Sequence, residues 1–242
     1  MVLSKRILLI TGWGGGAALL APLQAALQQH GHVVERINIF NAFDEAVLQH
    51  QVELARQFDV IIGWSLGGQL ATVLVDKIQQ KYQQAQILIT LASNPCFVAQ
   101  ADWTVAMRPE TFMQFKQSFA QDAISTLKRF GYLVCQGASS AKQDFLAMQK
   151  MLQPQPIALL QQGLVLLEQF NLVEMYKSYQ ATQLHVFAEH DALVPYQISE
   201  NMQHLAARKL SVVVMDGASH GFPCFMVQQT VQVIEDFLAQ SV

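Results

Sequence analysis

The apolar residues of this chain recur in two alternating patterns, short continuous runs and stripes at helical spacing. A short apolar run that ends at turn residues is typical of a strand buried on both faces. Six such runs occur, at residues 6–11, 33–39, 60–62, 86–91, 183–188 and 210–215. Helical stripes occur at Leu20, Leu23 and Leu27; at Leu48, Val52 and Ala55, behind a candidate N-cap at Asp44; at Leu70, Val73, Leu74 and Ile78; near 196–207; and at Val227, Val231, Ile234 and Leu238. This alternation predicts an α/β fold with a mostly parallel sheet flanked by helices.

The pattern changes between residues 97 and 180, where only helical spacing is found. The stripes there are Phe112, Phe115 and Phe119; Phe145, Met148 and Leu152; and Leu160, Leu164 and Leu167. We therefore expect an all-helical insertion at 97–180 in a core made of residues 1–96 and 181–242. An insertion at this place is expected to act as a lid over the active site, with some of its apolar side chains lining an acyl pocket.

The segment Gly63-Trp64-Ser65-Leu66-Gly67 joins the third expected strand to the helix after it. This is the context in which Gly-x-Ser-x-Gly forms a nucleophile elbow. Glycines on both sides remove the Cβ atoms that would clash in a sharp turn, so Ser65 can be held in a strained conformation with its hydroxyl above the sheet. The alternative is a serine in an ordinary turn, and the strand before and helix after favour the elbow.

A serine nucleophile needs a general base. Of the seven histidines, five fall in helical patterns, at a helix end or, for His185, inside a strand, which indicates packing or surface roles. His190 and His220 fall in loops after expected strands. We take His220 as the base, because the loop before the last helix can aim a side chain, and His190 as a neighbour of the acid.

The base needs a carboxylate to orient it. Asp191 directly follows the strand at 183–188, and Asp216 is the rival, although it lies close enough to His220 in sequence to shape the loop instead. We expect Asp191 to be the acid. The chain order Ser65, Asp191, His220 is that of an α/β-hydrolase.

The glycine-rich turn after the first strand, Gly12-Trp13-Gly14-Gly15-Gly16, is expected to supply the oxyanion hole. Its donors would be the main-chain N–H groups of Trp13 and Leu66, and the Trp13 indole could form a wall of the substrate site. A nucleotide-binding turn is the alternative, but the glycines do not match G-x-G-x-x-G and no Gly-Lys-Ser/Thr follows. The chemistry needs no metal and no organic cofactor.

Composition fits an enzyme with a large core. Apolar residues make up 52% of the 242 residues, charged residues 14%, and the net charge is −3. Nothing in that balance attracts nucleic acid. The three cysteines have no metal-like spacing, so we expect reduced thiols and a cytoplasmic protein. Residues 5–21 look like a signal peptide, but the glycine turn interrupts the apolar stretch, and no run reaches the roughly 18 residues of a membrane span.

Several motifs together resemble the pimeloyl-acyl-carrier-protein methyl ester esterase family of biotin synthesis, over nearly the whole chain. They are Gly12-Trp13-Gly14, Gly63-Trp64-Ser65-Leu66-Gly67-Gly68, Ala92-Ser93-Asn94-Pro95-Cys96-Phe97, His190-Asp191-Ala192-Leu193-Val194-Pro195 and Ala218-Ser219-His220. The resemblance implies a serine carboxylesterase with Ser65, Asp191 and His220 as its triad, which releases methanol from an ester linked to an acyl-carrier protein.

The resemblance also implies substrate contacts and a partner. Substrate would touch Trp13, Leu66 and His220, and the lid stretch Tyr132-Leu133-Val134-Cys135-Gln136 looks like the family's aromatic-to-glutamine segment, with Tyr132 and Gln136 as contacts. The family holds the acidic carrier protein with basic lid residues, for which Lys128, Arg129 and Lys142 are the candidates here.

Two features depart from the family pattern. Thr11 stands where the family has a histidine before Gly-Trp-Gly, and the sequence starts at the first strand, without the usual N-terminal hairpin.

Three other activities are compatible with the same residues: a broad-specificity carboxylesterase or thioesterase, an acyltransferase, and a ligand-binding homologue without turnover.

Overall fold

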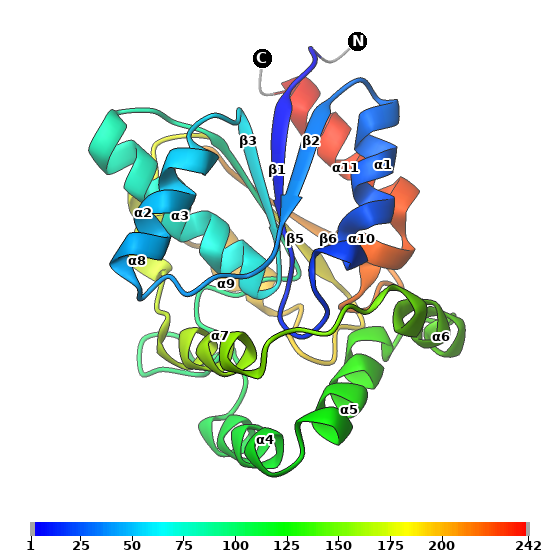
Figure 1. Cartoon of the computed structure of the whole chain (residues 1–242). Coiled ribbons are helices and arrows are strands. Elements are labelled where there is room, and N and C mark those ends of the chain that lie inside the picture. Colours follow the sequence, from blue (N-terminus) through cyan, green and yellow to red (C-terminus); the bar gives the residue numbers. More distant parts are fainter. Residues whose placement is uncertain (1–2, 241–242) are drawn as a thin grey trace.

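The computed structural model describes residues 3–240 and is built on one parallel sheet (Figure 1). The sheet has six strands in the order β2-β1-β3-β4-β5-β6, and every neighbouring pair is parallel. The strands are β1 (Arg6–Ile10), β2 (Val33–Ile37), β3 (Val60–Trp64), β4 (Ile87–Leu91), β5 (Gln183–Ala188) and β6 (Leu210–Met215). The predicted α/β fold is confirmed, with two strands ending earlier than expected, at Ile10 and Ile37.

Helices cover both faces of this sheet. The core helices are η1 (Ala17–Leu20), α1 (Ala21–Gln29), α2 (Glu45–Ala55), α3 (Leu66–Tyr82), α9 (Ile198–Gln203), α10 (Phe222–Phe225) and α11 (Val227–Gln240). Helices α1 and α11 pack together on one face, and α2 and α3 lie on the other (Figure 1). Asp44 caps α2 as predicted, because its carboxylate accepts the N–H of Val47. Helix α9 is shorter than the stretch expected near 196–207.

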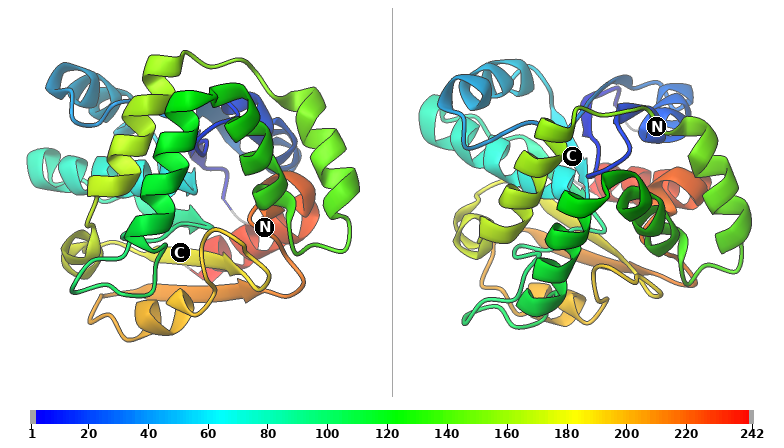
Figure 2. Two further views of the ribbon diagram at one scale, coloured as in Figure 1. Left: turned by 90° about the horizontal axis from the view of Figure 1, so that it is seen from below. Right: turned by 60° about the horizontal axis from the view of Figure 1, so that its bottom comes forward.

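Residues 97–180, named here the helical insertion, contain five helices and no strand. They are α4 (Pro109–Gln121), α5 (Ala123–Cys135), α6 (Ala141–Met151), α7 (Ile157–Gln169) and α8 (Val173–Ser178). Helices α4–α7 lie beyond the carboxyl-terminal ends of the strands (Figures 1 and 2). The short helices α8 and α10 were not expected, since neither is long enough to show a helical period.

Strand order fixes where a site can form. After β2 the chain returns past β1 to form β3, so the connections after β1 and β3 diverge at adjacent strand ends. In parallel sheets such a switch point opens a crevice at the carboxyl ends of the strands. Because Ile10 of β1 pairs with Gly63 of β3, the glycine turn after β1 lies beside the Gly63–Gly67 elbow.

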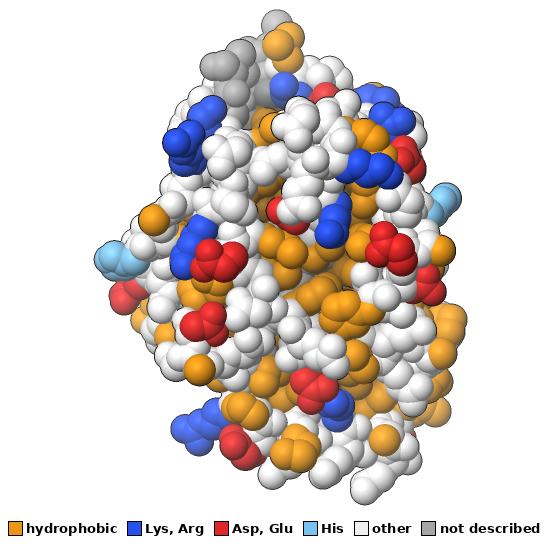
Figure 3. All heavy atoms as spheres, turned by 90° about the vertical axis from the view of Figure 1, so that its left-hand side faces the viewer, with side chains coloured by type: hydrophobic (Ala, Val, Ile, Leu, Met, Phe, Trp, Pro, Cys, Tyr) orange, Lys and Arg blue, Asp and Glu red, His pale blue; other side chains and the backbone are white. Residues whose placement is uncertain are grey.

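The surface is mixed in charge. On the face in Figure 3, Lys and Arg side chains are interspersed with Asp and Glu, and apolar patches lie between them. No helix in residues 3–240 is both long enough and apolar enough to cross a membrane.

Candidate active site

Ser65 occupies the sharp turn between β3 and α3. Its backbone has φ 56° and ψ −122°, a left-handed region that a serine adopts only when the surrounding fold imposes it. Two close approaches impose it here. A Cβ atom at Gly63 would lie 2.0 Å from the Gly67 carbonyl oxygen, and one at Gly67 would lie 2.2 Å from the Ile10 carbonyl oxygen. Glycines at 63 and 67 therefore let α3 start directly against β1 and β3, with Ser65 at the turn.

Asp191 and His220 come together from the loops after β5 and β6. Oδ2 of Asp191 lies 2.8 Å from Nδ1 of His220, and the two side chains are 0% and 1% exposed. The other carboxylate oxygen, Oδ1, accepts the main-chain N–H groups of Leu193 and Val194 at 2.8 and 2.9 Å. An ionised carboxylate only accepts hydrogen bonds, so Nδ1 is the donor and Nε2 of His220 keeps its lone pair for a proton.

The rival residues stand elsewhere. Asp216 is exposed, and no hydrogen bond between it and His220 is found within residues 3–240. The His190 ring is half exposed and lies 3.7 Å from the Glu189 carboxylate. Asp191 is thus the carboxylate that orients His220 in this structure.

Trp64 connects the elbow to the His220 loop. Its indole Nε1 donates to the His220 carbonyl oxygen at 2.9 Å, and the indole and imidazole centroids are 5.8 Å apart. The Ser65 hydroxyl itself makes no hydrogen bond to any residue in the described range 3–240. Such bonds are often formed only when substrate is bound. The sequence carries no local signal for this contact, because the hydrogen bond joins residues that are 156 positions apart.

The turn after β1 lies against Ser65. A Cβ atom at Gly12 would lie 3.2 Å from Cβ of Ser65. The main-chain N–H of Trp13 has no acceptor among residues 3–240, and Leu66 is the first residue of α3, where N–H groups lack intrahelical partners. Thr11 is fully buried, and its hydroxyl donates to the Gly16 carbonyl at 3.2 Å. Thr11 therefore closes the turn.

A small apolar cavity of about 80 Å³ opens at Ser65. Its other lining residues are Trp13, Phe97, Met107, Thr111, Phe112, Phe115, Phe130, Leu133, Leu167 and Leu193. No charged side chain from the described part of the chain lines it. A neutral group fits this cavity, whereas a carboxylate would be left unpaired in it.

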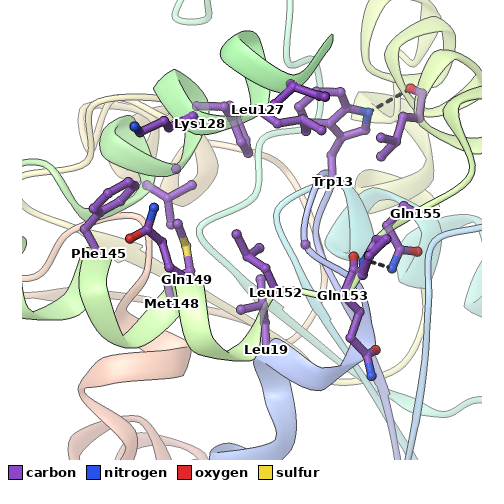
Figure 4. Close-up of a pocket in the computed structure, with 18 of the residues that line it drawn as sticks. Trp13, Leu19, Leu127, Lys128, Phe145, Met148, Gln149, Leu152, Gln153 and Gln155 are labelled. Carbon is purple, nitrogen blue, oxygen red and sulfur yellow. Dashed lines mark hydrogen bonds between the residues drawn. The ribbon is translucent and has the colours of Figure 1, made fainter.

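A second cavity, of about 340 Å³, adjoins the first at Trp13 and Phe130. Figure 4 shows residues that line it. The two rings line both cavities, and their centroids are 5.0 Å apart in an edge-to-face contact. Most of the lining is apolar, from the turn after β1 and from α5 and α6. Its longer polar side chains are Lys128, Gln149, Gln153 and Gln155.

The predicted contacts Tyr132 and Gln136 lie outside both cavities. They line a surface groove between α5 and α6 together with Lys128 and Lys142, and the Tyr132 ring is stacked on Phe145 with the centroids 3.7 Å apart. The aromatic residue of α5 that reaches the Ser65 cavity is Phe130. The sequence did contain a signal for it, since Leu127, Phe130 and Val134 form a stripe at helical spacing.

Of the three basic residues expected to contact a carrier protein, two line this groove and one does not. Lys128, Arg129 and Lys142 are all exposed. Lys128 and Lys142 face the α5–α6 groove, whereas the Arg129 guanidinium donates to the Thr126 hydroxyl at 3.2 Å and does not line it.

The remaining nucleophiles are poor candidates. Cys96, Cys135 and Cys224 are free and buried. Burial raises the pKa of the Cys96 and Cys135 thiols to about 12, and it raises the pKa of Cys224 as well. Thiols with such pKa values stay protonated at neutral pH and do not compete with Ser65. Within residues 3–240 no cluster of three or more His, Cys, Asp or Glu side chains is placed to bind a metal ion.

Comparison with known proteins places this geometry in a family. The model of the alpha/beta hydrolase family matches residues 7–235. The pimeloyl-[acyl-carrier protein] methyl ester esterase of Klebsiella pneumoniae subsp. pneumoniae is 31% identical over 225 residues, which cover 88% of this chain and 86% of that protein. The esterase of the same name from Aliivibrio fischeri is 29% identical over 226 residues, with the same coverage.

Solved structures support the fold. An esterase from Exiguobacterium antarcticum superposes with a TM-score of 0.79 at 14% identity, over 99% of this chain and 93% of that one. A bromoperoxidase from Bacillus anthracis gives a TM-score of 0.80 at 15% identity, over 98% and 93%. At such identities the likeness concerns the fold alone.

Proposed function

This chain belongs to the alpha/beta hydrolase family and, within it, to the pimeloyl-[acyl-carrier protein] methyl ester esterases, and on that basis we propose that it hydrolyses the methyl ester of a pimeloyl group carried by acyl-carrier protein. It is a carboxylic ester hydrolase. The observation that carries the mechanism is the buried Asp191–His220 hydrogen bond behind a strained Ser65. The product of this reaction is used in biotin synthesis, for which the methyl ester must be hydrolysed to the free carboxylate.

The first half of the reaction acylates the serine. Nε2 of His220 takes the proton of Ser65 as Oγ attacks the ester carbonyl. The negative charge that develops on the carbonyl oxygen is stabilised by the main-chain N–H groups of Trp13 and Leu66. When the tetrahedral intermediate collapses, His220 gives its proton to the departing methanol. The acyl group is then held as an ester of Ser65.

The second half repeats these roles with water. His220 deprotonates a water molecule, which attacks the acyl-Ser65 carbonyl, and the proton returns to Oγ as the bond to Ser65 breaks. The product is a carboxylate. No charged side chain from residues 3–240 lines the Ser65 cavity, so the carboxylate has no counter-ion there and leaves more readily than the neutral ester.

We propose that the helical insertion, residues 97–180, is the lid over this site and that its outer surface meets the carrier protein. The second cavity, lined by the insertion and the Trp13 turn, would take the acyl chain and the arm that links it to the carrier. The groove between α5 and α6 combines Lys128 and Lys142 with the exposed Tyr132 ring and Gln136. An acidic carrier suits this groove, with Arg129 beside it.

The three free thiols fit a reducing cytoplasm.

The direct test offers pimeloyl-carrier methyl ester and measures free pimeloyl-carrier by mass spectrometry. We expect turnover by the natural chain and none by Ser65→Ala, with the same melting temperature for both. Full activity of Ser65→Ala would overturn the mechanism. Equal rates on free and carrier-linked methyl esters would instead favour a broad-specificity carboxylesterase, an activity that the apolar Ser65 cavity also allows.

Carrier docking has its own test. A Lys128→Glu/Lys142→Glu double variant should raise KM for the carrier-linked ester and remove most of its dependence on salt, because exposed charge pairs are screened as ionic strength rises. Hydrolysis of a short aryl ester should not change. Lys150→Glu, an exposed lysine of α6 outside the groove, is the matched control. If both variants raise KM equally, the groove is not the docking site.

A further inference from the structure

The indole ring of Trp13 is held by the helical insertion, although Trp13 belongs to the turn after β1. The residue is 3% exposed. Its ring makes edge-on contacts with Phe115 and Phe119 of α4, at centroid distances of 5.5 and 5.4 Å, and with Phe130 of α5 at 5.0 Å. Three aromatic side chains of the insertion therefore fix the ring of a residue that lies beside the nucleophile.

Helix α7 supplies the polar anchor of the same ring. Nε1 of Trp13 donates to the Leu160 carbonyl oxygen at 2.8 Å, the bond that Figure 4 marks beside the Trp13 label. One turn further along α7, a Cβ atom at Gly163 would lie 2.6 Å from Cδ1 and 3.2 Å from Nε1 of Trp13. Glycine is less favourable than alanine inside a helix. Its presence at 163 is explained by the space that the indole occupies, together with Cδ1 of Ile39, which would lie 3.1 Å from the same Cβ.

The main-chain N–H of Trp13, unlike its ring, faces the reaction as the proposed oxyanion donor. Its N–H group is without an acceptor in the described residues, and the preceding Gly12 lies against Cβ of Ser65. A displacement of the ring would move this N–H, because the turn between Gly12 and Gly16 is short. An oxyanion donor acts only when it is held at hydrogen-bonding distance from the developing charge.

We propose that α7 positions the oxyanion hole through the Trp13 indole, with Gly163 as a positioning residue, so that the hole is formed only while the helical insertion is docked on the core. This inference rests on the proposed function, because it assigns the Trp13 N–H to the oxyanion. It ties the reactivity of Ser65 to the place of a helix that contributes no catalytic group.

The test is Gly163→Ala, assayed with a short aryl ester. The added methyl group pushes on Cδ1 of Trp13, and alanine favours the helix, so α7 itself stays formed. We expect kcat to fall about tenfold or more, since loss of one oxyanion donor costs roughly 10²–10³ and a misplaced donor costs less. KM should change less than about threefold. Gln162→Ala, the exposed neighbour on α7, is the matched control and should behave like the natural chain.

A double-mutant cycle separates positioning from a general structural effect. Trp13→Phe removes the indole N–H and with it the bond to the Leu160 carbonyl, so the smaller ring is free to turn away from a methyl group at 163. Gly163→Ala should then change kcat by less than about threefold. Trp13→Phe alone should lower kcat, and this second variant remains informative if Gly163→Ala does not fold. A boronic acid that adds to Ser65 should bind more weakly to Gly163→Ala, because its tetrahedral adduct places an oxygen in the oxyanion hole.

Two results would overturn the proposal. One is an unchanged kcat for a folded Gly163→Ala. The other is an equal loss of kcat from Gly163→Ala whether it is made in the natural chain or in the Trp13→Phe variant. Ser65→Ala tells this failure apart from failure of the proposed function: if Ser65→Ala is inactive while Gly163→Ala keeps full kcat, the hydrolase mechanism stands and only the role of α7 is wrong.

Discussion

Contacts that involve the main chain hold the three residues of the proposed triad. The Asp191 carboxylate receives two main-chain N–H groups in addition to His220, and the His220 carbonyl is fixed by the Trp64 indole. Ser65 is held by backbone approaches on both sides of its turn. Groups held in this way are already oriented before substrate arrives, which is what electrostatic stabilisation of a transition state requires.

The Asp191 carboxylate gives the first prediction. In Asp191→Asn the amide can donate to Nδ1, which favours the wrong tautomer of His220, so kcat on a short aryl ester should fall by about 10³–10⁴ at neutral pH. Circular dichroism should remain unchanged. Asp216→Asn removes the exposed rival carboxylate, which precedes His220 in the loop after β6, and should keep kcat. Equal losses in the two variants would contradict the assignment of Asp191.

The hydrogen bond from the Trp64 indole gives the second prediction. Trp64→Phe keeps an aromatic ring but leaves the buried His220 carbonyl without its donor, at a cost of about 1–3 kcal/mol. We expect a lower melting temperature and, because the base is less well held, a kcat reduced about three- to tenfold. Trp103→Phe is the matched control, since it breaks a buried indole bond to Asn94 away from the His220 loop. It should lower the melting temperature and leave kcat unchanged; a similar kcat loss there would mean that Trp64 acts only through stability.

Among the elements, the crossing of β3, α3 and β1 determines the position of Ser65, the proposed nucleophile. Gly63 and Gly67 let three backbones meet with no side chain between them. This geometry belongs to the elements together, because each glycine is close to the backbone of a different segment.

Gly63→Ala tests this contact. Its Cβ would meet main-chain atoms of Gly67 that cannot rotate away, so the free energy of unfolding should drop by at least the 1–3 kcal/mol typical of overpacking, or the chain should fail to fold. Gly31→Ala is the control. Gly31 has φ 92° but nothing within 4 Å of a Cβ, so it should lose only the roughly 1–2 kcal/mol of left-handed strain. Urea unfolding measures the free energy of unfolding of both variants. Equal losses would show that the structure accommodates a Cβ at Gly63 without the expected clash.

Periodicity located the long elements but not the orientation of the insertion's helices. The strands and α2, α3 and α11 follow from buried runs and stripes, and Asp44 was identified as a cap because capping is a local interaction. The side of α5 that faces Ser65 depends on how α4, α5 and α6 pack together. The family resemblance points to Tyr132, which lines the α5–α6 groove, whereas packing places Phe130 at the Ser65 cavity. The chain order of Ser65, Asp191 and His220 was readable from the sequence because each residue follows a strand.

At the scale of the whole molecule, a buried cluster of polar side chains from α3, β4, β5 and α8 joins the core to the last helix of the helical insertion. His185 of β5 bonds through Nδ1 to the Thr90 hydroxyl of β4 at 2.7 Å, and Tyr176 of α8 packs edge-on against its ring. The Tyr176 and Thr72 hydroxyls are 2.9 Å apart, which connects α8 to α3. His185 was expected to be structural, and the sequence carried no sign of these partners because they come from three distant segments.

The same histidine predicts how stability depends on pH. Burial lowers the pKa of His185 from 6.5 to about 3. Between these values the unfolded chain binds a proton that the folded chain does not, so the folded state loses stability as pH falls below about 6.5, by up to about 1.4 kcal/mol per pH unit. His185→Gln has no such proton. We expect the natural chain to be the more stable one at pH 7.5, because the Thr90 bond is intact, and this advantage to shrink steadily toward pH 5 in urea unfolding.

Other groups do not obscure this comparison. Burial raises the pKa of Asp76, which acts in the opposite direction, since the folded chain then holds a proton that the unfolded chain has released. Both proteins keep Asp76, so its contribution cancels in the difference between them. His50→Gln, at an exposed position, should follow the natural chain at every pH. Parallel stability curves for His185→Gln and the natural chain would mean that the His185 proton is not excluded from the folded core.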